Sequence, residues 1–371
     1  MMKKLKDICE IQYGYAFDSK CFTDDSAYPQ LARIRDVKRG YSDTYYSGEY
    51  SDEYVLSSGD LLVGMDGEFN ISKWMCDGAL LNQRVCKLIP KSGINKEYLR
   101  FAMSKALKEI ENRTSFVTVK HLSAKELNKL ELIIPIVDKQ NNIADSLVKL
   151  ENIINKRQQE LDKLDELVKA RFVELFGDQE TNPFGWVQCT IGDCCTLKSG
   201  TSLPAEVENE GGSIPYVKVG DMNYPGNERY ITISSRYVSE ETAGKGLFGV
   251  GSIIFPKRGG AIGTNKKRMT KLPICADLNI MGVSSNGKLL PEYLLTYFDL
   301  IDLGAFSDGS SVPQINNKNI APLAICIPPM ELQNQFADFV KQIDKSKFDN
   351  QIYLINLCIS NVLTEDLFSE Q

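Results

Sequence analysis

Histidine is almost absent from this sequence, since His121 is the only one, and none of the 10 cysteines form a C-x-x-C pair of the metal or thiol-redox type. Most metal-dependent and histidine-based schemes of catalysis are therefore excluded, and we expect no metal site and no catalytic residue. The sequence also lacks an apolar run near the ~20 residues of a membrane span and a charged-then-apolar leader. We expect a cytoplasmic protein with reduced cysteines that does not enter a membrane.

Proline and glycine are absent from Asp138 to Phe176, and Gly177 then supplies a stop. Apolar residues recur there at alternating spacings of four and three, which is the pattern of a helix with a continuous apolar seam. Such a helix would be roughly 55–60 Å long, far longer than the usual ~11–12 residues. The predicted seam consists of Ile143, Leu147, Leu150, Ile154, Leu161, Leu164, Val168 and Leu175, and it is interrupted by Arg157 and Arg171.

The same pattern occurs a second time near the end of the chain. Residues 119–150 align over residues 312–343 without a gap, and the identical pairs include a proline and a Gln-Asn dipeptide. Two unpartnered apolar stripes of this length can bury each other as a coiled coil, in which polar seam positions fix the register. The alignment predicts a second seam at Phe336, Val340, Ile343, Leu354, Leu357 and Phe368, with the polar residues Lys347, Asn350, Asn361 and Thr364 between them.

The remainder of the chain is duplicated as well. Gly14 aligns with Gly200, and a predicted strand at 31–37, with basic residues outward, aligns with 216–222. Further matches are Gly59–Val63 with Gly251–Phe255, Asn82 with Asn279, and Glu97–Leu99 with Glu292–Leu294. The chain is thus a duplicated domain rather than a solenoid, with a globular unit (1–135), a long helix (138–177), a second globular unit (182–328) and a second long helix (331–368).

Acidic residues are missing between Glu241 and Asp277, although the whole chain has a net charge of −6. A solvated loop with a chance imbalance of charge is one interpretation of this stretch, and a surface that faces phosphate groups is the other. The basic residues in it are Lys245, Lys257, Arg258, Lys266, Lys267, Arg268 and Lys271.

Short motifs appear in the same order in both halves of the chain. They are Leu5–Phe17, Ile133–Pro135 with Gln140, Leu175–Gly177, Gly185–Trp186, Ile191–Asp193, Lys198–Thr201, and Ile325–Pro329 with Gln333. No single motif is specific, but their order, present twice, resembles the DNA-specificity subunit of type I restriction-modification systems over essentially the whole chain. The resemblance implies an α+β fold, in which two similar mixed α/β target recognition domains are separated by two long helices. These helices would form an antiparallel coiled coil with pseudo-two-fold symmetry.

The resemblance also implies a function and a set of partners. Each recognition domain would recognise one half of a split site on double-stranded DNA. Two modification (methyltransferase) subunits and the restriction (translocase/endonuclease) subunits would bind the chain, and S-adenosylmethionine, ATP and Mg would belong to those subunits rather than to this one. Because a two-fold protein meets two half-sites on one face of a duplex, the helices should set the gap, and unlike units should recognise an asymmetric site.

Three sets of loop residues recur in both units and are candidates for contacts with bases or phosphates. Core aromatics around a glycine turn are the alternative for the first set, and a solvated strand face is the alternative for the second. The first set is Tyr13, Tyr15, Phe17, Lys198, Ser199 and Thr201; the second is Arg33, Arg35, Lys38, Arg39 and Lys218; the third is Thr114, Ser115, Lys120, His121, Ser310, Ser311 and Gln314. Candidates for phosphate contacts are Lys73, Arg84, Lys257, Arg258, Lys266, Lys267 and Arg268.

Two other classes of function account for less of the sequence. A DNA adenine methyltransferase needs an Asn/Asp-Pro-Pro-aromatic motif, and Asn182-Pro183-Phe184 lacks the second proline. The stretch 259–266 resembles a phosphate-binding loop but lacks the Gly-Lys-Ser/Thr ending. A non-catalytic coiled-coil adaptor of another defence complex would leave the duplicated units and their basic loops without a role.

Overall fold

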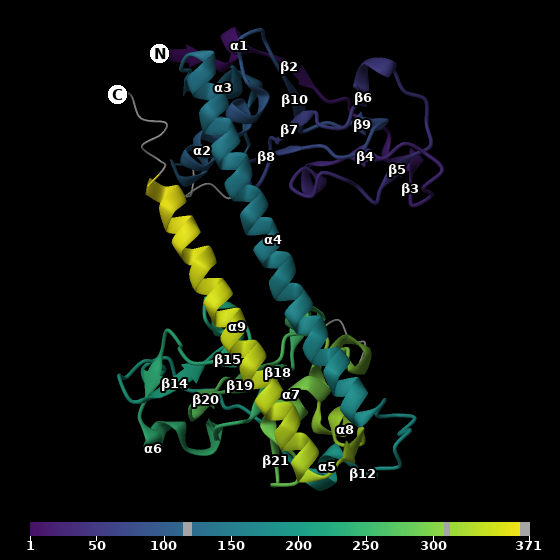
Figure 1. The fold of residues 1–371 in the computed structure, drawn as a ribbon, viewed down its shortest axis with the longest axis vertical. Coiled ribbons are helices and arrows are strands. Elements are labelled where there is room, and N and C mark those ends of the chain that lie inside the picture. The colour runs from purple at the N-terminus through teal and green to yellow at the C-terminus, as the bar shows by residue number, and fades with distance from the viewer. Residues whose placement is uncertain (114–120, 308–311, 364–371) are drawn as a thin grey trace. The chain divides into compact units, whose positions relative to one another are not determined.

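The structure is a computed structural model that describes residues 1–113, 121–307 and 312–363, in the last range with side chains up to Phe348. The chain forms two compact units. Unit 1 comprises Met1–Arg157 and the residues from Tyr353 onward, and unit 2 comprises Gln158–Ile352. The helix α4 (Val137–Phe176) continues without a break from one unit into the other (Figure 1). It is the long helix that the sequence predicts at 138–177.

Unit 1 is built around one antiparallel sheet, with smaller sheets beside it. The strands of the main sheet lie in the order β2 (Cys9–Tyr13), β10 (Val85–Pro90), β7 (Leu61–Gly64) and β8 (Asn70–Lys73). A three-stranded sheet has the order β4 (Leu31–Ala32), β9 (Ala79–Leu81) and β6 (Val55–Leu56). Two pairs complete the unit: β1 (Met2–Lys4) with β11 (Glu131–Ile133), and β3 (Phe22–Thr23) with β5 (Tyr45–Tyr46).

Helices pack against the main sheet of unit 1 and share its apolar core. They are α1 (Leu5–Ile8), α2 (Lys96–Arg113) and α3 (Ala124–Lys129), with 3₁₀ turns at η1 (Ser19–Cys21), η2 (Ile34–Asp36) and η3 (Asp52–Tyr54). The first turns of α4 join the same core, because Ile143 and Leu147 pack with Leu88 of β10 and Tyr98 of α2. The predicted seam therefore begins as part of a globular core.

Unit 2 repeats this plan with additional strands. Its main sheet has the order β13 (Cys195–Ser199), β21 (Ile280–Ser285), β18 (Ile253–Pro256), β19 (Arg268–Thr270) and β15 (Tyr230–Ile231). The second sheet has the order β16 (Tyr237–Val238), β14 (Ile214–Val217), β20 (Ile274–Ala276) and β17 (Leu247–Phe248), and β12 (Val187–Thr190) pairs with β22 (Ala324–Ile327). The helices are α5 (Ile191–Cys194), α6 (Glu240–Ala243), α7 (Pro291–Asp299), α8 (Asn317–Ile320) and α9 (Met330–Leu363). The 3₁₀ turns are η4 (Val219–Asn223), η5 (Gly244–Gly246), η6 (Gly259–Thr264) and η7 (Leu303–Phe306).

The strand order confirms that the chain is duplicated. The order β2, β10, β7, β8 in unit 1 matches β13, β21, β18, β19 in unit 2, and β4, β9, β6 matches β14, β20, β17. In both units the first pair of the matched second sheet is parallel, with Ala32 opposite Leu81 in unit 1 and Val217 opposite Ala276 in unit 2, and the next pair is antiparallel. The fold is α+β, with two similar mixed units and two long helices.

The structure corrects two details of the predicted alignment. The strand expected at 31–37 ends at Ala32, because η2 follows and the carboxylate of Asp36 is buried with the hydroxyl of Ser42. In unit 2 the buried Asp221 accepts a hydrogen bond from the Lys218 amide (2.7 Å), which likewise ends the strand in a 3₁₀ turn.

Asn82 was expected to match Asn279, and the structure matches it with Asp277 instead. The amide of Tyr15 donates to the Leu81 carbonyl, just as that of Thr201 donates to the Ala276 carbonyl. Leu81 and Ala276 are therefore equivalent, and so are the residues that follow them, Asn82 and Asp277. A one-residue match such as the predicted one has no neighbouring strand register to fix it.

In unit 2 the end of α4 packs against the start of α9. The ring of Phe336 lies 5.5 Å from the rings of both Phe172 and Phe176, measured between centroids. Farther along, Lys347 of α9 forms an ion pair with Asp165 of α4. Because α9 residues of higher number meet α4 residues of lower number, these two helical segments are antiparallel.

The predicted seam describes this packing in part. In the described side chains every seam residue, from Ile143 to Leu175 and from Phe336 to Lys347, is buried or partly buried. Phe172 and Phe176 are also fully buried, although the seam prediction left them out. They face the core of unit 2 beside Tyr293, so the helix carries a wider apolar face than a strict heptad. Leu354 and Leu357 are described by backbone only, and Phe368 lies outside the described residues.

A buried glutamine fixes the start of each long helix. Gln333 donates through Nε2 to the carbonyls of Lys288 (3.1 Å) and Pro328 (2.9 Å), and its Oε1 accepts from the Leu290 amide (2.8 Å). In unit 1, Gln140 makes the same three contacts, with Gly93, Pro135 and Asn95. One side chain thus satisfies a carbonyl of the turn before the long helix and two backbone groups of the turn before α7 in unit 2 or α2 in unit 1.

We expect Gln333→Leu to lower the free energy of unfolding of unit 2 by about 3 kcal/mol, because each unsatisfied buried polar group costs about 1–3 kcal/mol. Urea denaturation followed by hydrogen exchange of α7 and α9 measures the change. Asn334→Leu, at the adjacent exposed position, is the matched control. Equal stability of the two variants would contradict the role given to Gln333.

Candidate nucleic-acid interface

The same edge of the main sheet is bounded by a close chain crossing in both units. Gly14 follows β2, and a Cβ added to it would lie 2.0 Å from the Asn82 carbonyl oxygen. Gly200 follows β13, and its added Cβ would lie 2.2 Å from the Asp277 carbonyl oxygen. Only glycine fits where the backbone of a neighbouring segment approaches this closely. The crossing brings the end of the opening strand beside the turn before β10 or β21.

Two further segments meet this edge, and we call the resulting set of side chains the rim. In unit 2 the Lys257 amide donates to the Asn279 carbonyl (2.8 Å), and the Ile315 amide donates to the Lys257 carbonyl (2.9 Å). In unit 1 the corresponding bonds run from Met65 to Arg84 (2.9 Å) and from Leu122 to Met65 (2.7 Å). The unit 1 rim is Tyr13, Asp66, Arg84 and His121, and the unit 2 rim is Ser199, Lys257, Arg258 and Gln314.

The unit 2 rim is basic and amide-bearing. Lys257 donates from Nζ to the hydroxyl of Ser199 (2.9 Å), and burial lowers the pKa of its ammonium, as does the neighbouring charge of Arg258. Arg258 is exposed and pairs through its backbone with Gln314. Guanidinium and amide groups can form paired hydrogen bonds with guanine and adenine respectively, so this rim has the chemistry of a base-recognising surface.

The unit 1 rim is arranged around a carboxylate. Asp66 accepts a hydrogen bond from Nη1 of Arg84 (2.5 Å) through one oxygen and contacts Nδ1 of His121 through the other. Tyr13 lies partly buried, where its hydroxyl accepts from Asn128 (3.2 Å) and burial raises its pKa. Tyr13 is therefore a supporting aromatic, in line with the core alternative for the first loop set.

The remaining aromatics of the first set form a cluster beside the unit 1 rim. Tyr15 is 51% exposed, and its ring lies 5.2 Å from those of Phe17 and Tyr54. Phe17 is buried against Tyr46 and supports the cluster. The Tyr15 carbonyl accepts from the Gln83 amide (2.8 Å), which ties this cluster to the turn that carries Arg84. Tyr15 thus remains a candidate for stacking on a base.

The other members of the first set in unit 2 are held within the protein. The ammonium of Lys198 contacts the Leu247 carbonyl and lies 4.8 Å from the ring centre of Phe248. Thr201 is partly buried, and its amide pairs with the Ala276 carbonyl. Beside them lies the Ser199–Lys257 pair, whose two side chains are partly buried.

The basic residues of the second set mostly have acidic or hydroxyl partners in unit 1. Arg33 and Arg35 both donate to the hydroxyl of Thr44, at 3.5 and 3.2 Å. Arg39 bonds Asp36 (2.9 Å) and Asp43 (3.2 Å), while Lys38 pairs with Glu68 (3.5 Å). Lys73, assigned to phosphate, pairs with Glu97 (3.1 Å). The acidic partners offset much of the positive charge that Lys38, Arg39 and Lys73 carry.

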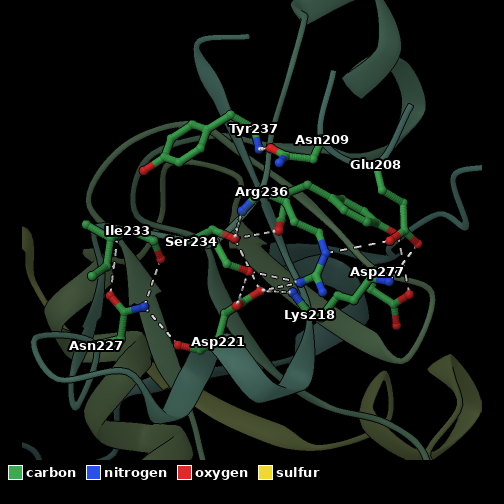
Figure 2. A network of polar contacts seen from close by, with 12 residues as sticks. Glu208, Asn209, Lys218, Asp221, Asn227, Ile233, Ser234, Arg236, Tyr237 and Asp277 are labelled. Atoms are coloured by element: carbon green, nitrogen blue, oxygen red, sulfur yellow. Dashed lines mark hydrogen bonds and ion pairs between the residues drawn. The ribbon is translucent and has the colours of Figure 1, made fainter. Parts of the chain in front are cut away.

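Lys218 belongs to a polar network in unit 2 (Figure 2). Its ammonium donates to Glu208 (2.6 Å), which also lies 3.6 Å from Nε of Arg236. Asp221 is buried at the centre and accepts from the hydroxyl of Ser234 (3.2 Å). The network joins the strand β14 to the loops around it, so Lys218 has a structural explanation.

Two of the three consecutive basic residues at 266–268, Lys267 and Arg268, are held by contacts within the protein. Lys267 is only 5% exposed and donates to Asn265 (2.7 Å) and to the Ile301 carbonyl (2.6 Å). Arg268 donates to the carbonyls of Lys267 (2.8 Å) and Met222 (3.3 Å), and Lys266 contacts Asn223. Two of these three cations therefore satisfy buried carbonyl groups, which charge counting along the sequence cannot reveal.

Burial lowers the pKa of Lys267 from 10.5 to about 8, against the opposing effect of Asp299. Between these two pH values the unfolded chain holds a proton that the folded protein has released, so the free energy of unfolding should rise with pH. We expect a rise of about 2 kcal/mol in the free energy of unfolding of the wild-type protein relative to Lys267→Met, measured by urea denaturation from pH 7.5 to 10. Lys288→Met, at an exposed position, should keep the wild-type dependence.

Several predicted site residues cannot be placed. Thr114, Ser115, Lys120, Ser310 and Ser311 lie outside the described residues. His121 and Gln314, which follow them, occupy equivalent rim positions. Asp66 was missed, because the search of the sequence favoured basic residues. Continuing the alignment of the buried strands by three positions would have placed Asp66 opposite Arg258.

The fold and the two rims define a binding protein made of a duplicated module, with one candidate interface per unit and a long helix after each. A family model described as "Type I restriction modification DNA specificity domain" matches residues 1–164 and 183–355. The chain belongs to this family.

Curated relatives and solved structures agree with this assignment. The chain is 37% identical over 166 residues to the EcoBI specificity subunit of a type I restriction enzyme from Escherichia coli, which covers 44% of this chain and about a third (35%) of that protein. It is 25% identical over 298 residues to the MjaIX specificity subunit from Methanocaldococcus jannaschii, covering 73% and 67%.

Two solved structures share the fold. A crystal structure of a type I restriction-modification S subunit from M. genitalium has a TM-score of 0.54 at 16% identity, covering 100% of this chain and 96% of that one. A chain solved in work on complex assembly and conformational transition of the type I R-M system has a TM-score of 0.53 at 15% identity, covering 99% and 97%. In the described part of this chain, no helix is both long and apolar enough to cross a membrane.

Proposed function

We propose that this chain is the DNA-recognition subunit of a type I restriction-modification complex, and that each unit recognises one half of a split DNA site. The observation that carries the proposal is the repeated rim, which occupies one fold position in both units and presents different side chains in each. Equivalent surfaces with unlike chemistry would recognise unlike sequences, so the target should be asymmetric. We propose residues 1–135 and 182–328 as the two target recognition domains.

The long helices would serve as the spacer and as the scaffold for partner subunits. We propose that the antiparallel contact of α4 with α9 inside unit 2 continues as a coiled coil along 138–177 and 331–368. Two modification subunits and the restriction subunits would bind the chain, and S-adenosylmethionine, ATP and Mg would act in those partners. The chain itself would be cytoplasmic, non-catalytic and without a cofactor.

Methylation mapping tests the proposal. The chain is expressed with its modification subunit in cells that otherwise lack adenine methylation, and methylated positions are mapped across the genome. We expect one asymmetric split motif with a fixed gap. Exchanging residues 1–135 for those of another specificity subunit should change one half of that motif and leave the other half intact. Absence of any motif with the partner present, or alteration of both halves by the exchange, would refute it.

A further inference from the structure

Arg84 occupies an unusual backbone conformation at the unit 1 rim. It is the third residue of the turn from Asn82 to Val85, which is closed by a hydrogen bond from the Val85 amide to the Asn82 carbonyl (3.3 Å). Its φ is +65°, in the left-handed region. Turns with positive φ at this position normally have glycine or asparagine there, because a Cβ crowds the following carbonyl oxygen and asparagine offsets that cost with local hydrogen bonds. The other described non-glycine residues with positive φ are both asparagines, Asn182 and Asn265.

The side chain of Arg84 is fixed at one end and open at the other. Its Nη1 donates to Asp66 (2.5 Å), and Asp66 itself is only 14% exposed, so the carboxylate lies beneath the guanidinium. The side chain of Arg84 is nevertheless 65% exposed. A guanidinium carries five N–H donors in one plane, so a single bond to Asp66 orients the group and leaves other donors for a ligand.

Asp66 also contacts Nδ1 of His121, whose side chain is 59% exposed. One carboxylate therefore holds two exposed, directional side chains on the rim. Unit 2 has no such arrangement among its described residues, because Arg258 stands at the position of Asp66 and Asn279 at that of Arg84. The Asp66–Arg84 pair is accordingly a property of one unit, and it can distinguish the two halves of a target.

We infer that Arg84 recognises a guanine in the half-site of unit 1, and that Asp66 is the positioning residue that holds its guanidinium for this contact. The inference rests on the proposed function and adds the base and the residue. Two parallel N–H donors from an arginine match the O6 and N7 acceptors on the major-groove edge of guanine. The strained turn and the carboxylate together supply the fixed direction that such a paired contact requires.

A phosphate contact explains the same observations less well. Binding of phosphate depends on net positive charge, and Asp66 offsets the charge of Arg84 at 2.5 Å. A phosphate contact also tolerates a flexible side chain, so it does not account for the strained backbone of Arg84. Base recognition, in contrast, depends on the direction of the donors and gains from an anchor behind them.

The test uses the chain in complex with its modification subunit, and duplexes in which each base pair of the mapped site is replaced in turn. We expect Arg84→Ala to lose discrimination at one G·C pair of one half-site, by about 5- to 150-fold in the ratio of dissociation constants. Discrimination in the other half-site should stay unchanged. Arg84→Lys should not restore it, because an ammonium lacks the fork, and Arg84→Asn should lose it while folding at least as stably.

The variant Asp66→Asn distinguishes the orientation of the Arg84 guanidinium from its electrostatic attraction to DNA. Removing the carboxylate leaves Arg84 more positive and less oriented, so discrimination at the same G·C pair should fall while affinity for non-specific DNA rises and becomes more salt-dependent. Loss of structure alone would lower both. Lys20→Ala removes an exposed charge in the same unit and should leave discrimination at every pair unchanged.

Two results would overturn the inference. One is an even loss of affinity for all sequences in Arg84→Ala, with a salt dependence reduced by about one phosphate contact, which identifies a phosphate clamp. The other is full discrimination at every position in Arg84→Ala. If the wild-type complex shows no sequence preference at all, the proposed function fails instead, and the duplex series distinguishes that outcome from the first two.

Discussion

Replacing Gly200 with alanine is expected to unfold the rim of unit 2 and lower the free energy of unfolding of that unit by about 3–5 kcal/mol. The added Cβ would lie 2.2 Å from the Asp277 carbonyl oxygen and 2.3 Å from that of Ala276. Both are backbone atoms of the segment crossed by the chain, so no side chain can rotate to relieve the clash. Either the crossing opens or β20 shifts, and both displace Ser199 and Lys257.

Hydrogen exchange read by mass spectrometry measures this effect for each unit separately. Peptides of β13, β20 and β21 should exchange faster in Gly200→Ala, while peptides of β2 and β10 in unit 1 should be unchanged. The motif methylated by the complex should lose its base preference in one half-site and keep it in the other. Gly220→Ala is the matched control, because an added Cβ there meets nothing within 4 Å. Wild-type protection of β20 in Gly200→Ala would show that the crossing is not a close one.

Truncating Phe336 is expected to separate α9 from α4 in unit 2, at a loss of about 3–5 kcal/mol in the free energy of unfolding. Phe336 is fully buried, and it packs edge-on against Phe172 and Phe176 at 5.5 Å. Alanine would leave a cavity between two helices and remove two aromatic pairs. Because the proposed scaffold depends on this helix pair, binding of the modification subunit should weaken as well.

The exposed Phe348 provides a control on the same helix. Its side chain is 61% exposed, so Phe348→Ala should change stability by a few tenths of a kcal/mol at most. Thermal unfolding and pull-down of the modification subunit should be measured on both variants. If Phe336→Ala were as stable as Phe348→Ala, the packing of α9 on α4 would contribute little to unit 2. If stability fell but partner binding did not, the helix pair would not be the scaffold.

The architecture could be predicted from sequence patterns, because each element of the duplicated module occurs in two copies and each copy supports the assignment of the other. The proline and glutamine at the start of both long helices are identical for a reason now visible, since Gln140 and Gln333 satisfy the same three backbone groups. The roles of single residues were predicted less well where they were inferred from the residue type alone. Lys267 looked like a phosphate contact because it is basic, yet it is buried, because its partners Asn265 and Ile301 enclose it. Alternation predicted a strand through Asp36, whereas the buried carboxylate ends that strand early.

The linear sequence by itself determined the duplicated module, its two long helices and the family of the chain, because periodic apolar spacing and repeated order are local or collinear properties. Only the tertiary structure decided which polar residues share a rim. Asp66 lies 18 positions from Arg84 and 55 from His121, yet one carboxylate binds both. Contacts of this kind depend on how strands cross, as at Gly14 and Gly200, and that crossing is set by the packing of the whole unit.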